Sequence, residues 1–157
     1  MFKTLSDIYL FFLKQKLNVG KNVVFYGNVF SLNLKNKKNI YLGNNVKINE
    51  HVFMFARRNS KIIIDDNTTV SAYSKLVTAS YDVNLFLEGK HINEDIHYQK
   101  DIYIGKNCWI GMGSIILPGV KLEGSGITVG AGSVVTKSFK GNNMLIAGNP
   151  AKIVKQY

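Results

Sequence analysis

The sequence of 157 residues has one cysteine and no apolar run long enough to form a transmembrane helix. Cys108 alone excludes an internal disulfide and a thiolate-rich metal site. The most apolar stretch, Leu5 to Leu13, is interrupted by Asp7 and falls well short of the roughly 20 residues that span a bilayer. It also lacks the basic start and small-residue cleavage site of a secretory signal. We therefore expect a cytoplasmic protein.

Acidic residues are scarce, with 10 against 20 lysines and arginines, so the net charge is +10. This charge favours anionic partners such as phosphates, acidic polysaccharide or the inner membrane surface. The basic residues are scattered, and no DNA-reading helix or motif accompanies them, so we expect no nucleic acid partner. There is also no glycine fingerprint for a dinucleotide and no phosphate-binding loop.

A repeat of six residues dominates what is present. An aliphatic side chain recurs at every sixth position, at Ile104, Ile110, Ile116 and Leu122. After one extra residue, the same spacing resumes at Val129 and Val135. Glycine often follows it, and a small residue often stands four positions after it. Earlier segments repeat the pattern at Leu42, Ile48, Met54, Ile64 and Val70.

A period of six fits neither an amphipathic helix nor a long alternating strand, but it fits a short strand followed by a corner. Three such units make one triangular coil with the aliphatic residues inside, so the sequence predicts a parallel β-helix. We expect a single domain over residues 1–157. Residues 1–18 form a helical N-terminal segment, 19–140 the coils with an excursion loop at about 80–101, and 141–157 a C-terminal cap.

Three sequence blocks suggest a family. They are Trp109-Ile110-Gly111, Ala131-Gly132-Ser133-Val134-Val135-Thr136 and Gly148-Asn149-Pro150-Ala151-Lys152. In this order they resemble the hexapeptide-repeat acyltransferases, above all the maltose, galactoside and capsule or lipopolysaccharide O-acetyltransferases. The resemblance implies an all-β, left-handed parallel β-helix.

The resemblance also implies a homotrimer that binds acetyl-CoA in grooves between neighbouring subunits and requires no metal. The residues that it assigns to the cofactor are Trp109, Met112, Ala131, Thr136, Lys137, Lys152 and Lys155. Lysines would meet the phosphates of the nucleotide as point charges.

Transfer of an acetyl group to a hydroxyl needs a base, and histidine suits this role near neutral pH. Where the family has that histidine, this chain has Tyr81. His91 and His97 lie farther along the same loop and are the candidate catalytic bases. Tyr81, Asp82 and Asn84 are candidates for binding the acceptor.

The sequence thus predicts an O-acetyltransferase that acts on a sugar hydroxyl, in surface polysaccharide or lipopolysaccharide biosynthesis. Two alternatives are a catalytically impaired trimer that still binds CoA and an N-acetyltransferase of an amino sugar. A third is a γ-class carbonic anhydrase, with zinc on His51, His91 and His97. The basic, apolar N-terminal segment allows a peripheral membrane contact.

Overall fold

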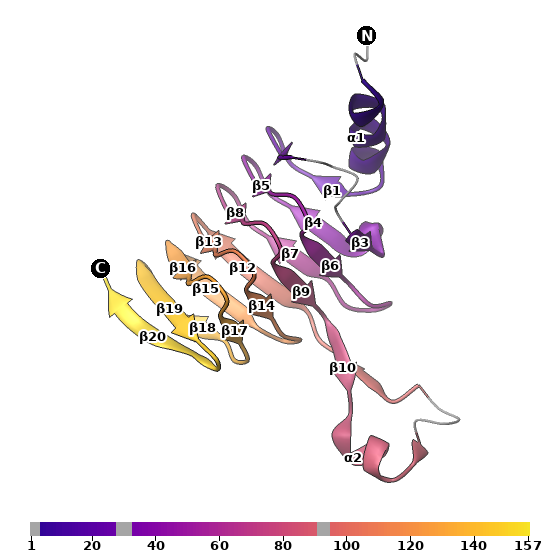
Figure 1. The fold of residues 1–157 in the computed structure, drawn as a ribbon, viewed down its shortest axis with the longest axis vertical. Coiled ribbons are helices and arrows are strands. Elements are labelled where there is room, and N and C mark those ends of the chain that lie inside the picture. The colour runs from indigo at the N-terminus through magenta and orange to yellow at the C-terminus, as the bar shows by residue number, and fades with distance from the viewer. Residues whose placement is uncertain (1–3, 28–32, 91–94) are drawn as a thin grey trace.

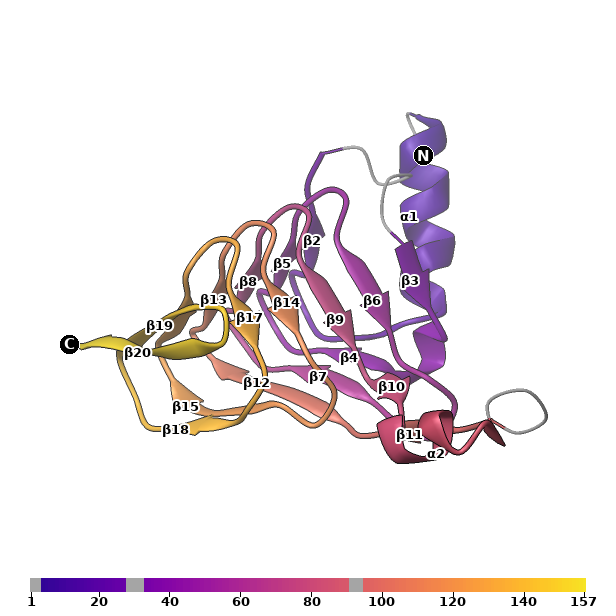
Figure 2. The ribbon, with the colours of Figure 1, turned by 60° about the horizontal axis from the view of Figure 1, so that its bottom comes forward.

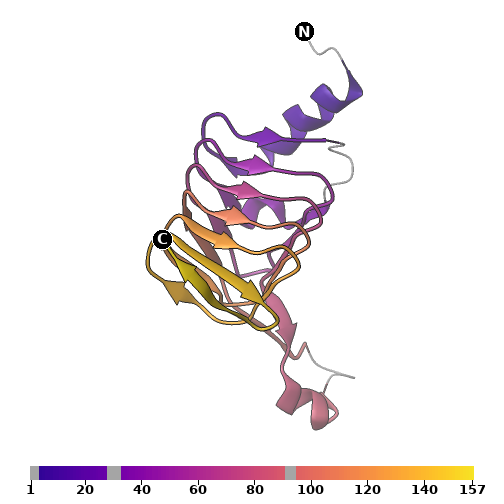
Figure 3. The same ribbon diagram turned by 60° about the vertical axis from the view of Figure 1, so that its left-hand side comes forward.

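The computed structural model describes residues 4–27, 33–90 and 95–157. Short strands follow one another around a triangular prism, and each coil stacks on the one before it (Figures 1 and 3). Helix α1 (Leu5–Gln15) lies at one end of the stack and the C-terminal strands lie at the other. The prediction of an all-β, left-handed parallel β-helix is confirmed.

Three sheets form the sides of the prism, as the view in Figure 2 shows. The first sheet contains β1 (Asn18–Val19), β4 (Ile40–Leu42), β7 (Ile62–Ile64), β12 (Ile102–Lys106), β15 (Lys121–Ser125) and β18 (Phe139–Lys140). The second contains β2 (Val24–Phe25), β5 (Lys47–Ile48), β8 (Thr69–Val70), β13 (Trp109–Ile110), β16 (Ile127–Val129), β19 (Met144–Gly148) and β20 (Ala151–Gln156). The third contains β3 (Asn33–Lys35), β6 (Phe53–Phe55), β9 (Lys75–Val77), β14 (Ile115–Ile116) and β17 (Val134–Val135).

The repeated aliphatic residues form the core of the prism. Each of the six positions from Ile104 to Val135 in the repeat is at most 1% exposed. Strand neighbours stack these side chains directly, so that Ile110 lies between Val70 and Val129. Because burial of one such side chain stabilises the fold by about 1.5–3 kcal/mol, the hexad is the main source of stability.

A ladder of asparagines marks the corner between the first and second sheets. Asn45, Asn67 and Asn107 have φ of 55°, 58° and 54°. Asparagine tolerates this left-handed conformation better than most residues. Their side chains also bond from coil to coil, over 2.9 Å between Asn45 and Asn67 and 3.2 Å between Asn67 and Asn107. Asparagine at this corner therefore both adopts the turn conformation and links neighbouring coils.

Helix α1 closes the N-terminal end of the prism. A capping box starts the helix, because the Asp7 backbone N–H donates to Thr4 Oγ1 (3.2 Å) and the Thr4 N–H donates to Asp7 Oδ2 (2.9 Å). Leu13 and Leu17 are buried against the first coil. No helix among the described residues is long and apolar enough to cross a membrane.

The C-terminal cap begins later than residue 140. Strand β19 still pairs in parallel with β16 and buries Met144 and Ile146, so the second sheet continues through it. Strand β20 then turns back antiparallel to β19, after the cis peptide bond between Asn149 and Pro150. This hairpin covers the last coil.

The predicted excursion leaves the prism between the third and first sheets (Figures 1 and 2). It consists of β10 (Ala79–Tyr81), the short helix α2 (Val83–Leu87) and β11 (His97–Gln99), with β10 and β11 antiparallel. The 3-10 helix η2 (Lys37–Asn39) occupies the same corner on an earlier coil.

Candidate functional site

A groove runs along the corner between the second and third sheets. Its main part is a cavity of about 380 Å³, lined by Asn49, Ser71, Trp109, Gly111, Met112, Thr128, Val129, Gly130, Ala131 and Leu145. A second cavity of about 250 Å³ shares Asn49 and Met112 with the first. The two therefore form one elongated depression across several coils, which we call the corner groove.

Trp109 forms one wall of the corner groove. Its indole Nε1 donates to Ser71 Oγ over 2.9 Å, which fixes the ring across the neighbouring coil. The side chain is 56% exposed, so it is not a core residue of the prism. Beneath it, Gly111 permits the close approach of coils, because a Cβ there would lie 2.5 Å from the carbonyl oxygen of Val129.

Three of the seven cofactor residues expected from the sequence line this groove, namely Trp109, Met112 and Ala131. Lys155 lies directly opposite Leu145 of the groove in the β19–β20 pairing, and Lys152 lies opposite Ala147. The tail lysines thus flank the C-terminal end of the groove. Thr136 and Lys137 follow β17 and lie outside the groove lining.

The excursion brings Tyr81 and His97 together. The two residues are partners in the β10–β11 pairing, and their ring centroids are 4.3 Å apart. Tyr81, the residue predicted to stand in place of the family's histidine, thus has a histidine beside it on the opposite strand. His91, the other predicted base, lies outside the described residues.

His97 is part of a polar chain that sequence reasoning missed. Its Nδ1 lies 2.7 Å from Asp95 Oδ1, and the second carboxylate oxygen of Asp95 accepts from Arg57 Nη2 over 2.6 Å. Arg58 adds a longer ion pair of 3.4 Å to the same oxygen. The hydrogen bond from Arg57 and then that from His97 hold the pKa of Asp95 well below its ordinary value. The carboxylate is therefore ionised at neutral pH.

Asp82 has a structural task in this excursion. Its carboxylate accepts from the backbone N–H groups of Asn84 (3.0 Å) and Leu85 (3.3 Å), so it caps helix α2. Asn84 itself is exposed on that helix. Of the three predicted acceptor residues, Tyr81 is the one in direct contact with His97.

His51 lies at another corner, apart from the excursion. Its ring stacks on that of Tyr73 at 4.7 Å, and both residues have positive φ. Within the described residues, no three histidine, cysteine or carboxylate side chains form a cluster that could hold a metal. His51 and His97 thus do not converge on one zinc ion.

Comparison with known proteins is consistent with this geometry. Residues 102–137 match the family model described as the hexapeptide repeat of succinyl-transferase. The structure has the fold of the hexapeptide-repeat acyltransferases, and the predicted resemblance is confirmed.

Individual relatives extend the comparison. The chain is similar to a maltose O-acetyltransferase of Clostridium difficile 630, with 28% identity, a TM-score of 0.81 and coverage of 99% of this chain and 78% of that one. A galactoside acetyltransferase in complex with coenzyme A has the same fold, with 23% identity, a TM-score of 0.83 and coverage of 99% and 73%. A Schizosaccharomyces pombe protein named as an acetyltransferase is 39% identical over 95 residues, which are 60% of this chain. The aligned part spans 43% of that curated relative, less than half its length.

Proposed function

We propose that this protein is an acetyltransferase that moves the acetyl group of acetyl-CoA to a hydroxyl group of a sugar. The observation that carries the proposal is the chain from His97 through Asp95 to Arg57. The similarity to a maltose O-acetyltransferase supports the reaction class and a saccharide acceptor. We further propose a cytoplasmic role in the synthesis of surface polysaccharide or lipopolysaccharide.

In this proposal His97 is the general base. The contact of its Nδ1 with ionised Asp95 favours the tautomer with the proton on Nδ1, so Nε2 has a free lone pair. Arg57 holds the carboxylate in place through its own hydrogen bond. The ring of His51, in contrast, stacks on that of Tyr73.

The chemistry follows from this arrangement. His97 Nε2 takes the proton of the sugar hydroxyl as its oxygen attacks, and Asp95 offsets the positive charge that the imidazole gains. Acetyl-CoA supplies the activated acetyl group, since its carbonyl carbon forms the new ester bond as the bond to sulfur breaks. The proton on His97 then passes to the departing thiolate, which leaves the base ready for another cycle. Tyr81, in ring contact with His97, restricts the orientation of the imidazole.

The corner groove suits the pantetheine chain of acetyl-CoA. It is long, and Trp109 and Met112, each 56% exposed, give it apolar walls. Asn49 and Ser71 provide polar groups in the same lining. Lys152 and Lys155, beside its C-terminal end, would meet the phosphates.

A homotrimer would complete the site. In one chain the corner groove and His97 lie at two different corners of the prism, on either side of the third sheet (Figure 2). The outward side chains of that sheet are largely apolar and only partly exposed, and they include Phe53, Phe55, Val77, Ile115 and Val134. Burial of this face between subunits would place the groove of one subunit beside the excursion of the next. Light scattering of the purified protein should then give three times the mass of the chain.

The direct test measures release of free thiol from acetyl-CoA in the presence of a panel of sugars. We expect turnover with wild type and a loss of about 10²–10⁴-fold in kcat for His97→Ala, at unchanged affinity for CoA. His51→Ala is the matched control and should keep its turnover.

Other outcomes would overturn parts of the proposal. Full activity of His97→Ala would exclude this residue as the base. Acetylation of amino sugars alone would make the protein an N-acetyltransferase. CoA binding without transfer to any sugar would identify the catalytically impaired trimer, and no CoA binding would exclude the reaction class.

A further inference from the structure

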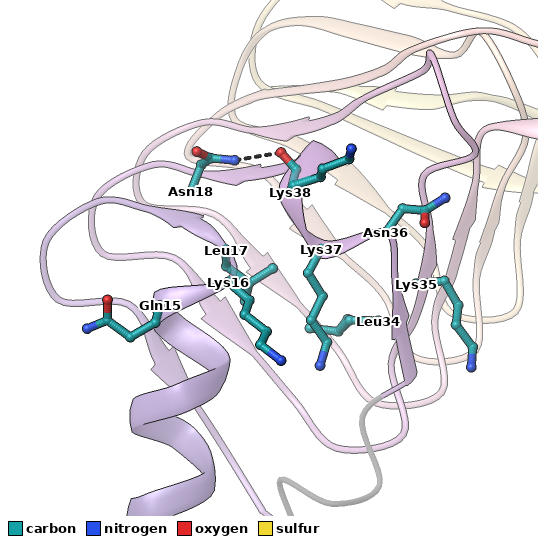
Figure 4. A pocket seen from close by; sticks show the side chains of 9 residues that line it. All are labelled: Gln15, Lys16, Leu17, Asn18, Leu34, Lys35, Asn36, Lys37 and Lys38. Atoms are coloured by element: carbon teal, nitrogen blue, oxygen red, sulfur yellow. Dashed lines mark hydrogen bonds between the residues drawn. The ribbon is translucent and has the colours of Figure 1, made fainter.

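A second large cavity lies at the N-terminal end of the prism, far along the chain from the residues of the proposed acetyl transfer. It has a volume of about 610 Å³ and lies between the end of α1 and the segment from β3 to η2 (Figure 4). Its lining consists of Gln15, Lys16, Leu17, Asn18, Leu34, Lys35, Asn36, Lys37 and Lys38. We call it the lysine cavity.

Positive charge is concentrated around this cavity. The side chains of Lys16 and Lys37 extend side by side in the same direction, whereas that of Lys38 points the other way (Figure 4). The first 49 residues of the chain contain eight lysines and one acidic residue, Asp7. Within the described part of the chain, none of the four lysines of the lining forms an ion pair with a carboxylate.

The proximity of these ammonium groups is electrostatically unfavourable. Burial, followed by the charges of Lys16 and Lys35, lowers the pKa of Lys37. Like charges held together without a counter-charge destabilise the fold, and a bound anion would relieve the repulsion. The cavity is therefore electrostatically suited to an anionic ligand.

An apolar surface adjoins the lysines. A smaller cavity of about 230 Å³ shares Lys16 and Lys37 with the lysine cavity, and Tyr9, Phe12 and Leu13 complete its lining. Phe12 is 58% exposed, and Leu5 on the same face of α1 is 77% exposed. A ligand in the lysine cavity can thus have an apolar part beside its charged part.

We propose that the lysine cavity binds the phosphate group of an anionic ligand. Ammonium groups are effective point-charge partners for phosphate oxygens. The amides of Asn18 and Asn36 in the same lining already donate to the backbone carbonyls of Lys38 (2.8 Å) and Ala56 (2.7 Å), so the lysines are the groups available to the phosphate. The phosphate can belong to a soluble ester or to the headgroup of an anionic lipid, and the neighbouring apolar surface suits the lipid. This site is independent of the acetyl transfer proposed above.

The test uses two probes on the full-length protein. Inorganic pyrophosphate is titrated calorimetrically, and vesicles of phosphatidylglycerol with phosphatidylcholine are compared with vesicles of phosphatidylcholine alone by co-sedimentation. The variant is Lys16→Gln with Lys37→Gln. The control is Lys121→Gln with Lys140→Gln, which removes the same charge from exposed positions on the first sheet.

We expect the Lys16/Lys37 variant to lose at least about tenfold in affinity and the control to bind as wild type does. Pyrophosphate binding would show that a soluble phosphate suffices as ligand, and binding to the anionic vesicles alone would assign the site to a lipid headgroup. Equal losses of affinity in both variants would show that the net charge of the protein alone accounts for binding, and this would overturn the proposal. Absence of binding to both probes would overturn it as well. Thermal unfolding of both variants verifies that they fold.

Discussion

Asp95 Oδ1 lies 2.7 Å from His97 Nδ1, two residues farther along the chain. If this contact orients the base, Asp95→Asn should lower kcat on the order of 10- to 100-fold. The KM for acetyl-CoA should change little, because Asp95 is not in the corner groove. We therefore predict that Asp95 is a positioning residue, and the measurement is whether the substitution changes kcat without changing KM.

The control for this substitution is Glu88→Gln, which removes a carboxylate from the same excursion. Glu88 pairs with Lys90 over 3.0 Å on the surface and has no contact with His97 among the described interactions. We expect it to be neutral. A wild-type kcat for Asp95→Asn would disprove the positioning role of Asp95.

The core and corners of the fold are predictable from sequence because they repeat. Each coil imposes the same demand, an aliphatic side chain inside and a residue that tolerates the left-handed conformation at the corner. Ile104 and Ile110 satisfy the first demand, and Asn67 and Asn107 satisfy the second. The excursion interrupts the period, so its internal pairing could not be predicted in this way.

The partner of His97 nevertheless left a signal in the sequence. In an extended segment, residues two apart point to the same side. Asp95 and His97 follow this spacing, with buried Ile96 between them. In contrast, no local pattern could predict the lysine cavity, because Lys16 follows α1 and Lys37 lies on a later coil. Only the packing of α1 on the prism brings them together.

The hydrogen bond between Trp109 and Ser71 allows a test of the corner groove. Trp109→Ala should raise the KM for acetyl-CoA about tenfold or more, since an apolar wall is lost. Ser71→Ala removes only the hydrogen bond of 2.9 Å and should raise the KM by about fivefold. Trp109→Phe removes the same hydrogen bond together with part of the ring and should raise the KM at least as much.

The double variant with Trp109→Phe and Ser71→Ala is the internal control. Both substitutions remove the same hydrogen bond, so the double variant should be no worse than Trp109→Phe alone. Additive losses would show that the two side chains act separately and would count against a groove wall oriented by Ser71.

Glycine at position 105 is a steric requirement of stacking. A Cβ on Gly105 would lie 2.1 Å from the carbonyl oxygen of Gly124 on the next coil. Gly105→Ala should therefore lower the free energy of unfolding by more than about 3 kcal/mol, as measured by urea denaturation.

Gly113 provides the matched comparison for this substitution. Its φ is 67°, but a Cβ there would meet no atom within 4 Å. Gly113→Ala therefore costs only the backbone strain, about 1 kcal/mol. Equal destabilisation by the two substitutions would contradict the packing argument.

Tyr103 makes stability sensitive to alkaline pH. Its hydroxyl donates to Asp65 Oδ2 over 2.7 Å, and this hydrogen bond, followed by burial, raises the pKa of Tyr103 to about 12. The folded protein therefore holds the proton more tightly than the unfolded chain, whose tyrosine titrates near 10. The stabilisation is complete below pH 10 and is lost as the pH rises through 12. Across this window, the free energy of unfolding of wild type should fall by about 1–2 kcal/mol more than that of Tyr103→Phe. Parallel decline of the two proteins between pH 9 and 12 would refute the assignment.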